Sequence, residues 1–181
     1  MRALGIDPVH DTRQTFDGLL AAMSRPGTVH TVVAPADHAV VATLVDHEVT
    51  VATEDKTLQN ALSGLGRFDS ARPENADVVH VHEHGDVNVQ ECKRGSLVEP
   101  SDGATVIYRV ETVSSGRTDA TTVTLSGPGV DGATEFSVSL PERELSALAE
   151  AQPGSPKGID AVFAAKTPLA AIPRSGSAAV A

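Results

Sequence analysis

The sequence contains little of several residue types, and each shortage excludes a class of structure. Cysteine occurs once, at Cys92, so no disulfide can form within the chain. Tryptophan is absent and aromatic residues make up 3% of the 181 residues, so the core must consist mainly of Val, Ala, Leu and Ile. No apolar run approaches the roughly 20 residues of a membrane-spanning helix, and residues 1–10 lack the apolar segment of a signal peptide. We therefore expect a soluble, cytoplasmic protein.

Basic residues are scarce relative to acidic ones. The chain has 24 Asp and Glu residues against 14 Lys and Arg residues, which gives a net charge of −10. Binding to a nucleic-acid backbone requires clustered cations, so this balance argues against DNA or RNA as a partner. An acidic surface with few lysines is typical of a salt-adapted protein, but an ordinary acidic protein can have the same composition.

Apolar residues that recur with the period of a helix predict four helical segments. The first starts at Asp11, an N-cap residue, and ends before Pro26-Gly27. The spacing of Ser139 and Glu142 is that of a capping box and predicts another helix start. The predicted helices are residues 11–23, 37–45, 56–65 and the segment that carries Leu145 and Leu148.

Short apolar or alternating runs predict the strands. These runs are residues 28–33, 49–52, 76–82, 104–113, 121–125, 159–164 and 169–172, with 87–90 as a possible partner of 76–82. A polar turn between 104–113 and 121–125 predicts an antiparallel hairpin. No repeat or linker interrupts the pattern, so we predict a single α/β domain with a mixed sheet over residues 1–174. Residues 175–181 are small and are predicted to form a flexible tail.

Histidines offer the clearest pattern for metal binding. His80, His82 and His84 alternate along a predicted strand, which would place their imidazoles on one face and Glu83 on the other. Such a face could hold Zn²⁺. An exposed strand edge that carries histidines on its polar side would show the same pattern, and we expect no metal or other cofactor in this chain.

Two arginines beside prolines, Arg25 and Arg174, are the candidate residues for contact with an anion or a partner. A guanidinium held in a rigid turn can bind carboxylate or phosphate oxygens through two hydrogen bonds, although a surface ion pair looks the same in sequence. Other catalytic patterns are missing. Gly127-Pro128-Gly129 lacks the lysine of a phosphate-binding loop, and there is no nucleophile elbow around a serine. The catalytic residues therefore remain unassigned.

Five motifs lie in a fixed order between residues 16 and 174. They are FDGLLAAMSRPG at 16–27, GSLVEP with GAT at 95–105, LSGPGV at 125–130, PKGID at 156–160 and AIPR at 171–174. In this order they resemble the PhnH family of the carbon–phosphorus lyase system of phosphonate metabolism. The three-histidine run is not a feature of that family, and Ser155 stands where the family often has an aromatic residue.

The resemblance implies a three-layer α/β fold, with a mixed sheet and flanking helices, similar to the pyridoxal-phosphate-dependent transferases but without their cofactor. It also implies an accessory subunit that works with PhnG, PhnI and PhnJ. Their complex transfers an alkylphosphonate to C1 of the ribose of MgATP and releases adenine. We expect the isolated chain to form a homodimer.

Two other functions are compatible with the residues themselves. One is a metal-dependent hydrolase built on His80, His82 and His84. The other is a binding module in which Arg25 and Arg174 hold a phosphonate or a nucleotide.

Overall fold

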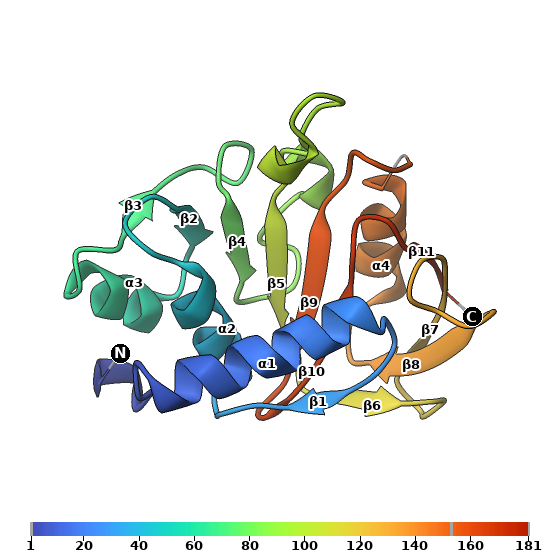
Figure 1. Ribbon diagram of the computed structural model, residues 1–181, viewed down its shortest axis with the longest axis horizontal. Helices are drawn as coiled ribbons and strands as arrows, with labels where there is room; N and C mark the ends of the chain where they lie inside the picture. Colours follow the sequence, from blue (N-terminus) through green and yellow to red (C-terminus); the bar gives the residue numbers. More distant parts are fainter. Residues whose placement is uncertain (1, 153, 181) are drawn as a thin grey trace.

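The main sheet determines the architecture of the chain (Figure 1). The structure is a computed structural model that describes residues 2–152 and 154–180, and within them this sheet has seven strands in the order β1-β10-β9-β5-β4-β2-β3. The strands are β1 (His30–Thr31), β2 (Thr50–Thr53), β3 (Asp69–Ser70), β4 (Val78–Val81), β5 (Thr105–Arg109), β9 (Asp160–Ala164) and β10 (Pro168–Ile172). Strands β3, β2, β4, β5 and β9 pair in parallel, whereas β10 pairs antiparallel with both β9 and β1.

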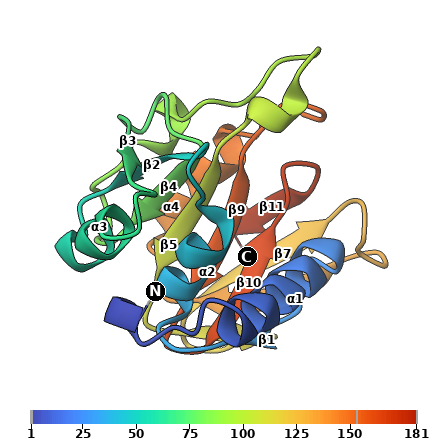
Figure 2. The same ribbon diagram turned by 60° about the vertical axis from the view of Figure 1, so that its left-hand side comes forward.

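Helices α1 (His10–Ser24), α2 (Ala36–Leu44) and α3 (Lys56–Ser63) cover one face of the main sheet (Figure 2). Their apolar sides pack on alternate residues of the strands, such as Ile107 of β5 and Val162 of β9. The remaining short element at this end of the chain is a 3₁₀ helix, η1 (Arg2–Leu4). The contacts of α1, α2 and α3 with the sheet form the first of two large cores.

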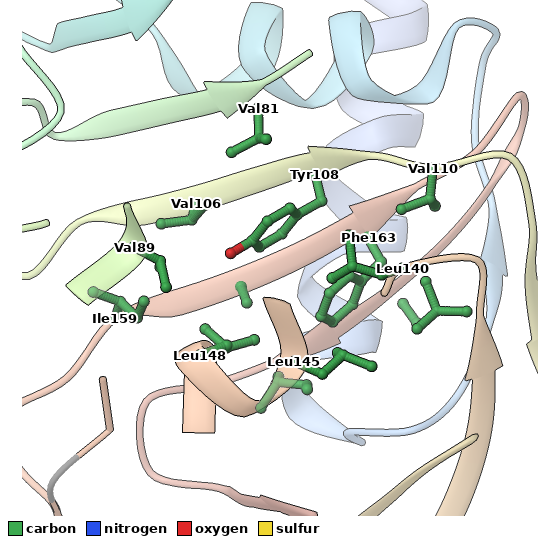
Figure 3. Close-up of a cluster of buried hydrophobic side chains, with 14 of the residues drawn as sticks. Val81, Val89, Val106, Tyr108, Val110, Leu140, Leu145, Leu148, Ile159 and Phe163 are labelled. Carbon is green, nitrogen blue, oxygen red and sulfur yellow. The ribbon is translucent and has the colours of Figure 1, made fainter. Parts of the chain in front are cut away.

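A smaller sheet and one helix cover the opposite face. The sheet has the order β11-β7-β8-β6, and it lies with α4 against the other set of alternate strand residues. Tyr108 stacks on Phe163 in this second core, with ring centroids 5.6 Å apart, beside Leu145 and Leu148 of α4 (Figure 3). The elements are η2 (Val89–Glu91), η3 (Pro100–Asp102), β6 (Val113–Ser115), β7 (Thr121–Ser126), β8 (Thr134–Val138), α4 (Glu142–Glu150) and β11 (Ser177–Val180). The molecule is thus a three-layer α/β domain.

The structure confirms the predicted α/β class with mixed sheets and flanking helices, and it confirms the predicted helices to within two residues. Two predicted caps are wrong. Helix α1 starts one residue earlier than predicted, and the Asp7 carboxylate, not that of Asp11, accepts the backbone N–H groups of Val9 and His10. The Ser139 hydroxyl oxygen accepts backbone N–H groups from a distant loop and does not cap α4.

Three predictions about strands are also wrong. The apolar run 104–113 bends after Arg109, so β5 and β6 belong to different sheets, and β7 pairs with β8 and β11 instead of with β5. Residues 87–90 do not pair with β4, whose neighbours are the parallel strands β2 and β5. Within the predicted tail, residues 177–180 form β11, which pairs with β7 and contacts α4, and residue 181 lies outside the described residues. None of the helices described here is long and apolar enough to cross a membrane.

Candidate functional site

The carboxyl ends of β2, β4 and β5 meet at one edge of the main sheet. After β2 the chain forms α3 on one face and continues to β3. After β4 it passes over the opposite face through η2 and returns to β5. The two connections therefore leave neighbouring strands in opposite directions. In open α/β sheets, ligands bind at such a topological switch point.

A network of ionisable side chains occupies this edge. Its members are Asp37 and His38 from the first turn of α2, Asp55 at the N-cap of α3, His80 at the end of β4, His82 just after β4, and Arg109 at the end of β5. The parallel register of β2, β4 and β5 brings these distant segments together, because Thr53 pairs with His80 and His80 with Ile107.

Arg109 joins the two carboxylates of the network. Its Nε donates to Oδ2 of Asp37 at 2.6 Å, and its Nη2 donates to Oδ2 of Asp55 at 3.2 Å. The same Nη2 lies 2.7 Å from Nε2 of His38, which is itself 2.7 Å from Asp55. The Asp37 and Asp55 side chains are only 2% and 6% exposed. Removing one partner from such a buried pair leaves a charge uncompensated, so this network depends on Arg109.

His80 is a buried, neutral hydrogen-bond donor to Asp37. Its Nε2 lies 3.0 Å from Oδ2 of Asp37, and its Nδ1 lies 2.9 Å from Oγ1 of Thr53. Burial lowers the pKa of His80 below its ordinary value. The neutral ring therefore donates Nε2–H to Asp37 and accepts a hydrogen bond from the Thr53 hydroxyl.

Both carboxylates are ionised at neutral pH. Burial by itself raises the pKa of Asp37, but the hydrogen bond from His80 and the charge of Arg109 outweigh it, so the pKa lies well below the usual range. Burial also raises the pKa of Asp55, whereas hydrogen bonds from His38 and from the backbone N–H of Leu58 lower it to about 2. The two charged carboxylates of the network therefore share one guanidinium, that of Arg109.

An open hollow of about 810 Å³ lies over the network. The buried and half-buried residues of its wall are His38, Asp55, His82 and Arg109, and the exposed ones at its mouth are Glu54, Lys56, Thr57, Glu83 and Asp86. Three carboxylates face one ammonium at the mouth, so an isolated multivalent anion would be repelled there. The charges suit a ligand that carries both an anionic group and a positive charge.

Comparison with known proteins assigns the chain to a family. The family model of the bacterial phosphonate metabolism protein PhnH matches residues 5–179. The chain belongs to the PhnH family. The resemblance seen in the sequence is thereby confirmed, and the chain has a role in phosphonate metabolism. No curated protein matches it significantly. The network and the hollow lie within the part of the chain that matches the PhnH model.

The fold brings together two of the three histidines that suggested a metal site. Strand β4 ends at Val81, and the rings of His80 and His82 lie 6.1 Å apart in the network. His84 is exposed in the following loop and does not line the hollow. Both ring nitrogens of His80 are already hydrogen-bonded. In the described part of the chain, no group of three or more His, Cys, Asp or Glu side chains is arranged to hold a metal ion.

Neither of the predicted anion-binding arginines lines the hollow. Arg174 is ion-paired with Asp160 and bonded to backbone carbonyls at the opposite edge of the sheet. Arg25 is exposed after α1, and its side chain has no ion pair within the described residues. The arginine of the site is Arg109. The alternating histidines pointed to two members of the site, His80 and His82. The position of Asp55 at the start of α3 is a local signal that could have added a third, whereas nothing local in the sequence distinguished Arg109.

Proposed function

We propose that this PhnH-family chain is an accessory subunit of the carbon–phosphorus lyase core complex, together with PhnG, PhnI and PhnJ. The complex transfers an alkylphosphonate to C1 of the ribose of MgATP with release of adenine. The observation that carries this proposal is the family match over residues 5–179. The buried thiol of Cys92 agrees with an accessory role, because burial raises its pKa to about 11 and keeps it protonated at neutral pH.

Co-expression tests the proposal directly. We expect the chain to elute from a size-exclusion column in one particle with PhnG, PhnI and PhnJ, and to form a homodimer when it is expressed alone. The three partners without this chain serve as the control for particle size. A chain that elutes alone while all three partners are present would contradict the proposal.

We also propose that the fold is related to the pyridoxal-phosphate-dependent transferases but binds no such cofactor. Lys56 is the lysine at the hollow, and its Nζ donates to Oε1 of Gln59 at 3.1 Å. Treatment with pyridoxal phosphate and borohydride, at equimolar cofactor, should leave the mass of Lys56 peptides unchanged. A stoichiometric adduct on Lys56 would contradict this part of the proposal.

The hollow favours a second candidate function, a binding module for a phosphonate or a nucleotide. Nη1 of Arg109 has no hydrogen-bond partner among the residues described, and its side chain is 33% exposed at the hollow. Arg109, not Arg25 or Arg174, would bind the phosphorus oxygens. The carboxylates at the mouth would bind an ammonium group or the magnesium ion of a nucleotide.

Calorimetry on the isolated chain tests this second function. We expect 2-aminoethylphosphonate and MgATP to bind more tightly than methylphosphonate, which carries no positive charge. His82→Ala should weaken binding, because His82 lines the hollow, whereas Arg25→Ala should not. Absence of heat with all three ligands would exclude a site that is complete in this chain.

A further inference from the structure

Family motifs that contribute nothing to the network meet at the other edge of the main sheet. They are residues 95–100, 103–105, 156–160 and 171–174. Strands β5 and β9 begin there, and Thr105 pairs with Asp160. The loop that precedes β5 projects beyond this edge at the top of Figure 1, away from the carboxyl ends of the parallel strands.

Arg174 fastens the base of this loop to β9. Its backbone N–H donates to Oδ1 of Asp160 at 2.8 Å, and its Nε donates to Oδ2 at 3.0 Å. The remaining guanidinium nitrogens donate to the carbonyl oxygens of Pro100 and Gly103. One side chain from the last motif therefore holds two points of the loop and one strand.

Glycines allow the chain segments to approach each other at this base. A Cβ atom on Gly103 would lie 2.3 Å from the carbonyl oxygen of Gly158, which is far closer than atoms can pack. Gly95 has a φ of +68°, and a Cβ there would lie 2.7 Å from the carbonyl oxygen of Pro100. The N–H of Gly158 donates to the carbonyl of Arg94 at 2.9 Å and closes the base.

The tip of the loop is a hydrogen-bonded turn with two aliphatic side chains. The N–H of Ser96 donates to the carbonyl of Glu99 at 3.0 Å, and the N–H of Glu99 donates to the Ser96 hydroxyl at 2.8 Å. Leu97 and Val98 between them are 73% and 84% exposed, the largest values among the exposed large apolar side chains of the described residues. Single exposed apolar residues are ordinary on protein surfaces. Two neighbours on a fixed, projecting turn indicate contact with another molecule.

The charges beside the tip indicate the kind of molecule. Glu99 and Asp102 are the charged residues between 95 and 103, and both are exposed. Acidic groups oppose contact with an anionic membrane surface or a nucleic-acid backbone. A second copy of this loop would bring the same two acidic residues against them, so the expected homodimer would not pair loop to loop. A protein pocket that is apolar inside and basic at its rim fits both features.

We infer that residues 95–103 form a docking loop, in which Leu97 and Val98 insert into an apolar, basic-rimmed pocket on a partner protein. The identity of that partner as another subunit of the phosphonate-processing complex rests on the proposed function. The motifs around Arg174 serve to hold the loop rigid before binding, which lowers the entropy that is lost when the partners associate.

The test compares two double variants in a binding assay with the purified partner subunits. Leu97→Ser with Val98→Ser removes the apolar tip and should weaken binding by roughly 100-fold, about tenfold for each aliphatic side chain that is no longer buried. Phe16→Ser with Leu20→Ser is the matched control, because these side chains are 50% and 54% exposed on α1. The control should bind as the wild type does, and both variants should keep the wild-type circular dichroism spectrum.

The outcomes separate the two proposals. If the wild type does not bind the partner subunits, both the proposed function and the docking loop are wrong. If the wild type binds and the loop variant binds within about threefold of it, the docking loop alone is wrong. Equal loss in the control variant, or binding of the wild-type loop to vesicles of anionic lipid, would also overturn the inference. Loss confined to the loop variant supports it.

Discussion

The two edges of the main sheet are built by different means. At the carboxyl edge, Arg109 is bound by the side chains of Asp37 and Asp55, which come from separate helices. At the amino edge, Arg174 is bound by one carboxylate and by backbone carbonyls, between glycines that allow close approach. A ligand can replace side-chain partners, whereas backbone contacts fix one geometry. This difference agrees with the two proposals, ligand binding at the carboxyl edge and docking at the amino edge.

The largest effect is expected when the carboxyl edge loses its guanidinium. Arg109→Met leaves two buried carboxylates without their shared cation and should lower the free energy of unfolding by about 3 kcal/mol. Arg117→Met is the matched control, since Arg117 pairs with Glu135 but is 66% exposed. Its loss should change stability far less, because solvent screens exposed ion pairs. Urea unfolding of both variants measures the difference, and equal losses would mean that burial of the network is energetically unimportant.

The amino edge should be most sensitive to added volume. Gly103→Ala places a Cβ atom against the Gly158 carbonyl and forces the base of the loop apart, at a cost of about 2 kcal/mol. Gly64→Ala is the control, because Gly64 has a helical φ of −62° and its nearest neighbour would be 3.3 Å away. It should change stability by less than about 1 kcal/mol. Hydrogen exchange should rise at residues 95–104 in the first variant alone, and unchanged exchange there would contradict the assigned role of Gly103.

Only the carboxyl edge should respond to mild acid through His80. The pKa of His80 in the folded chain lies below its ordinary value of 6.5, so below that pH the unfolded chain binds a proton that the folded chain does not. The contribution of the neutral His80 ring to the free energy of unfolding is complete above pH 6.5. It is lost as the pH falls, by up to about 1.4 kcal/mol per pH unit. The stability contributed by Asp55, whose pKa is about 2, persists in this range and is lost only below about pH 4.

Urea unfolding at pH 7.5, 6.5 and 5.5 would measure the His80 effect. His80→Gln keeps a donor for Asp37 but cannot titrate, so the slope between pH 6.5 and 5.5 should become shallower than in the wild type. His47→Gln, at a side chain that is 77% exposed, should leave the slope unchanged. A wild-type stability that does not vary between these pH values would show that His80 is not held neutral by the fold.

Elements defined by local sequence were predictable, whereas of the site only His80 and His82 were singled out in the sequence. The 3.6-residue period of α1 and the apolar runs of β9 and β10 are local signals, and the structure confirms them. The network depends on the parallel register of β2, β4 and β5, in which residues 53, 80 and 107 lie side by side. Neighbouring parallel strands are joined by long crossover segments, so they lie far apart in the sequence. A single sequence therefore does not show which polar residues of these strands will meet.

Arg174 illustrates a second limit of prediction from the sequence. Its position beside Pro173 indicated a guanidinium held in place, and it is held by Asp160. Sequence motifs show that a residue matters and not whether it acts in binding or in support. The same holds for Gly103 and Gly158, whose close approach becomes visible only when β5 and β9 are placed side by side.

The smallest expected effect lies in the core between the two edges. The hydroxyl group of Tyr108 in β5 is buried, and it has no hydrogen-bond partner among the residues described (Figure 3). Burial raises the pKa of Tyr108, so the group stays protonated and bears the cost of lost hydration. Tyr108→Phe should therefore raise the free energy of unfolding by about 1 kcal/mol. Tyr108→Leu, which loses the stacking on Phe163, should lower it by about 2 kcal/mol. Destabilisation by Tyr108→Phe would show that the hydroxyl has a partner and that the core, like the edges, depends on a polar contact.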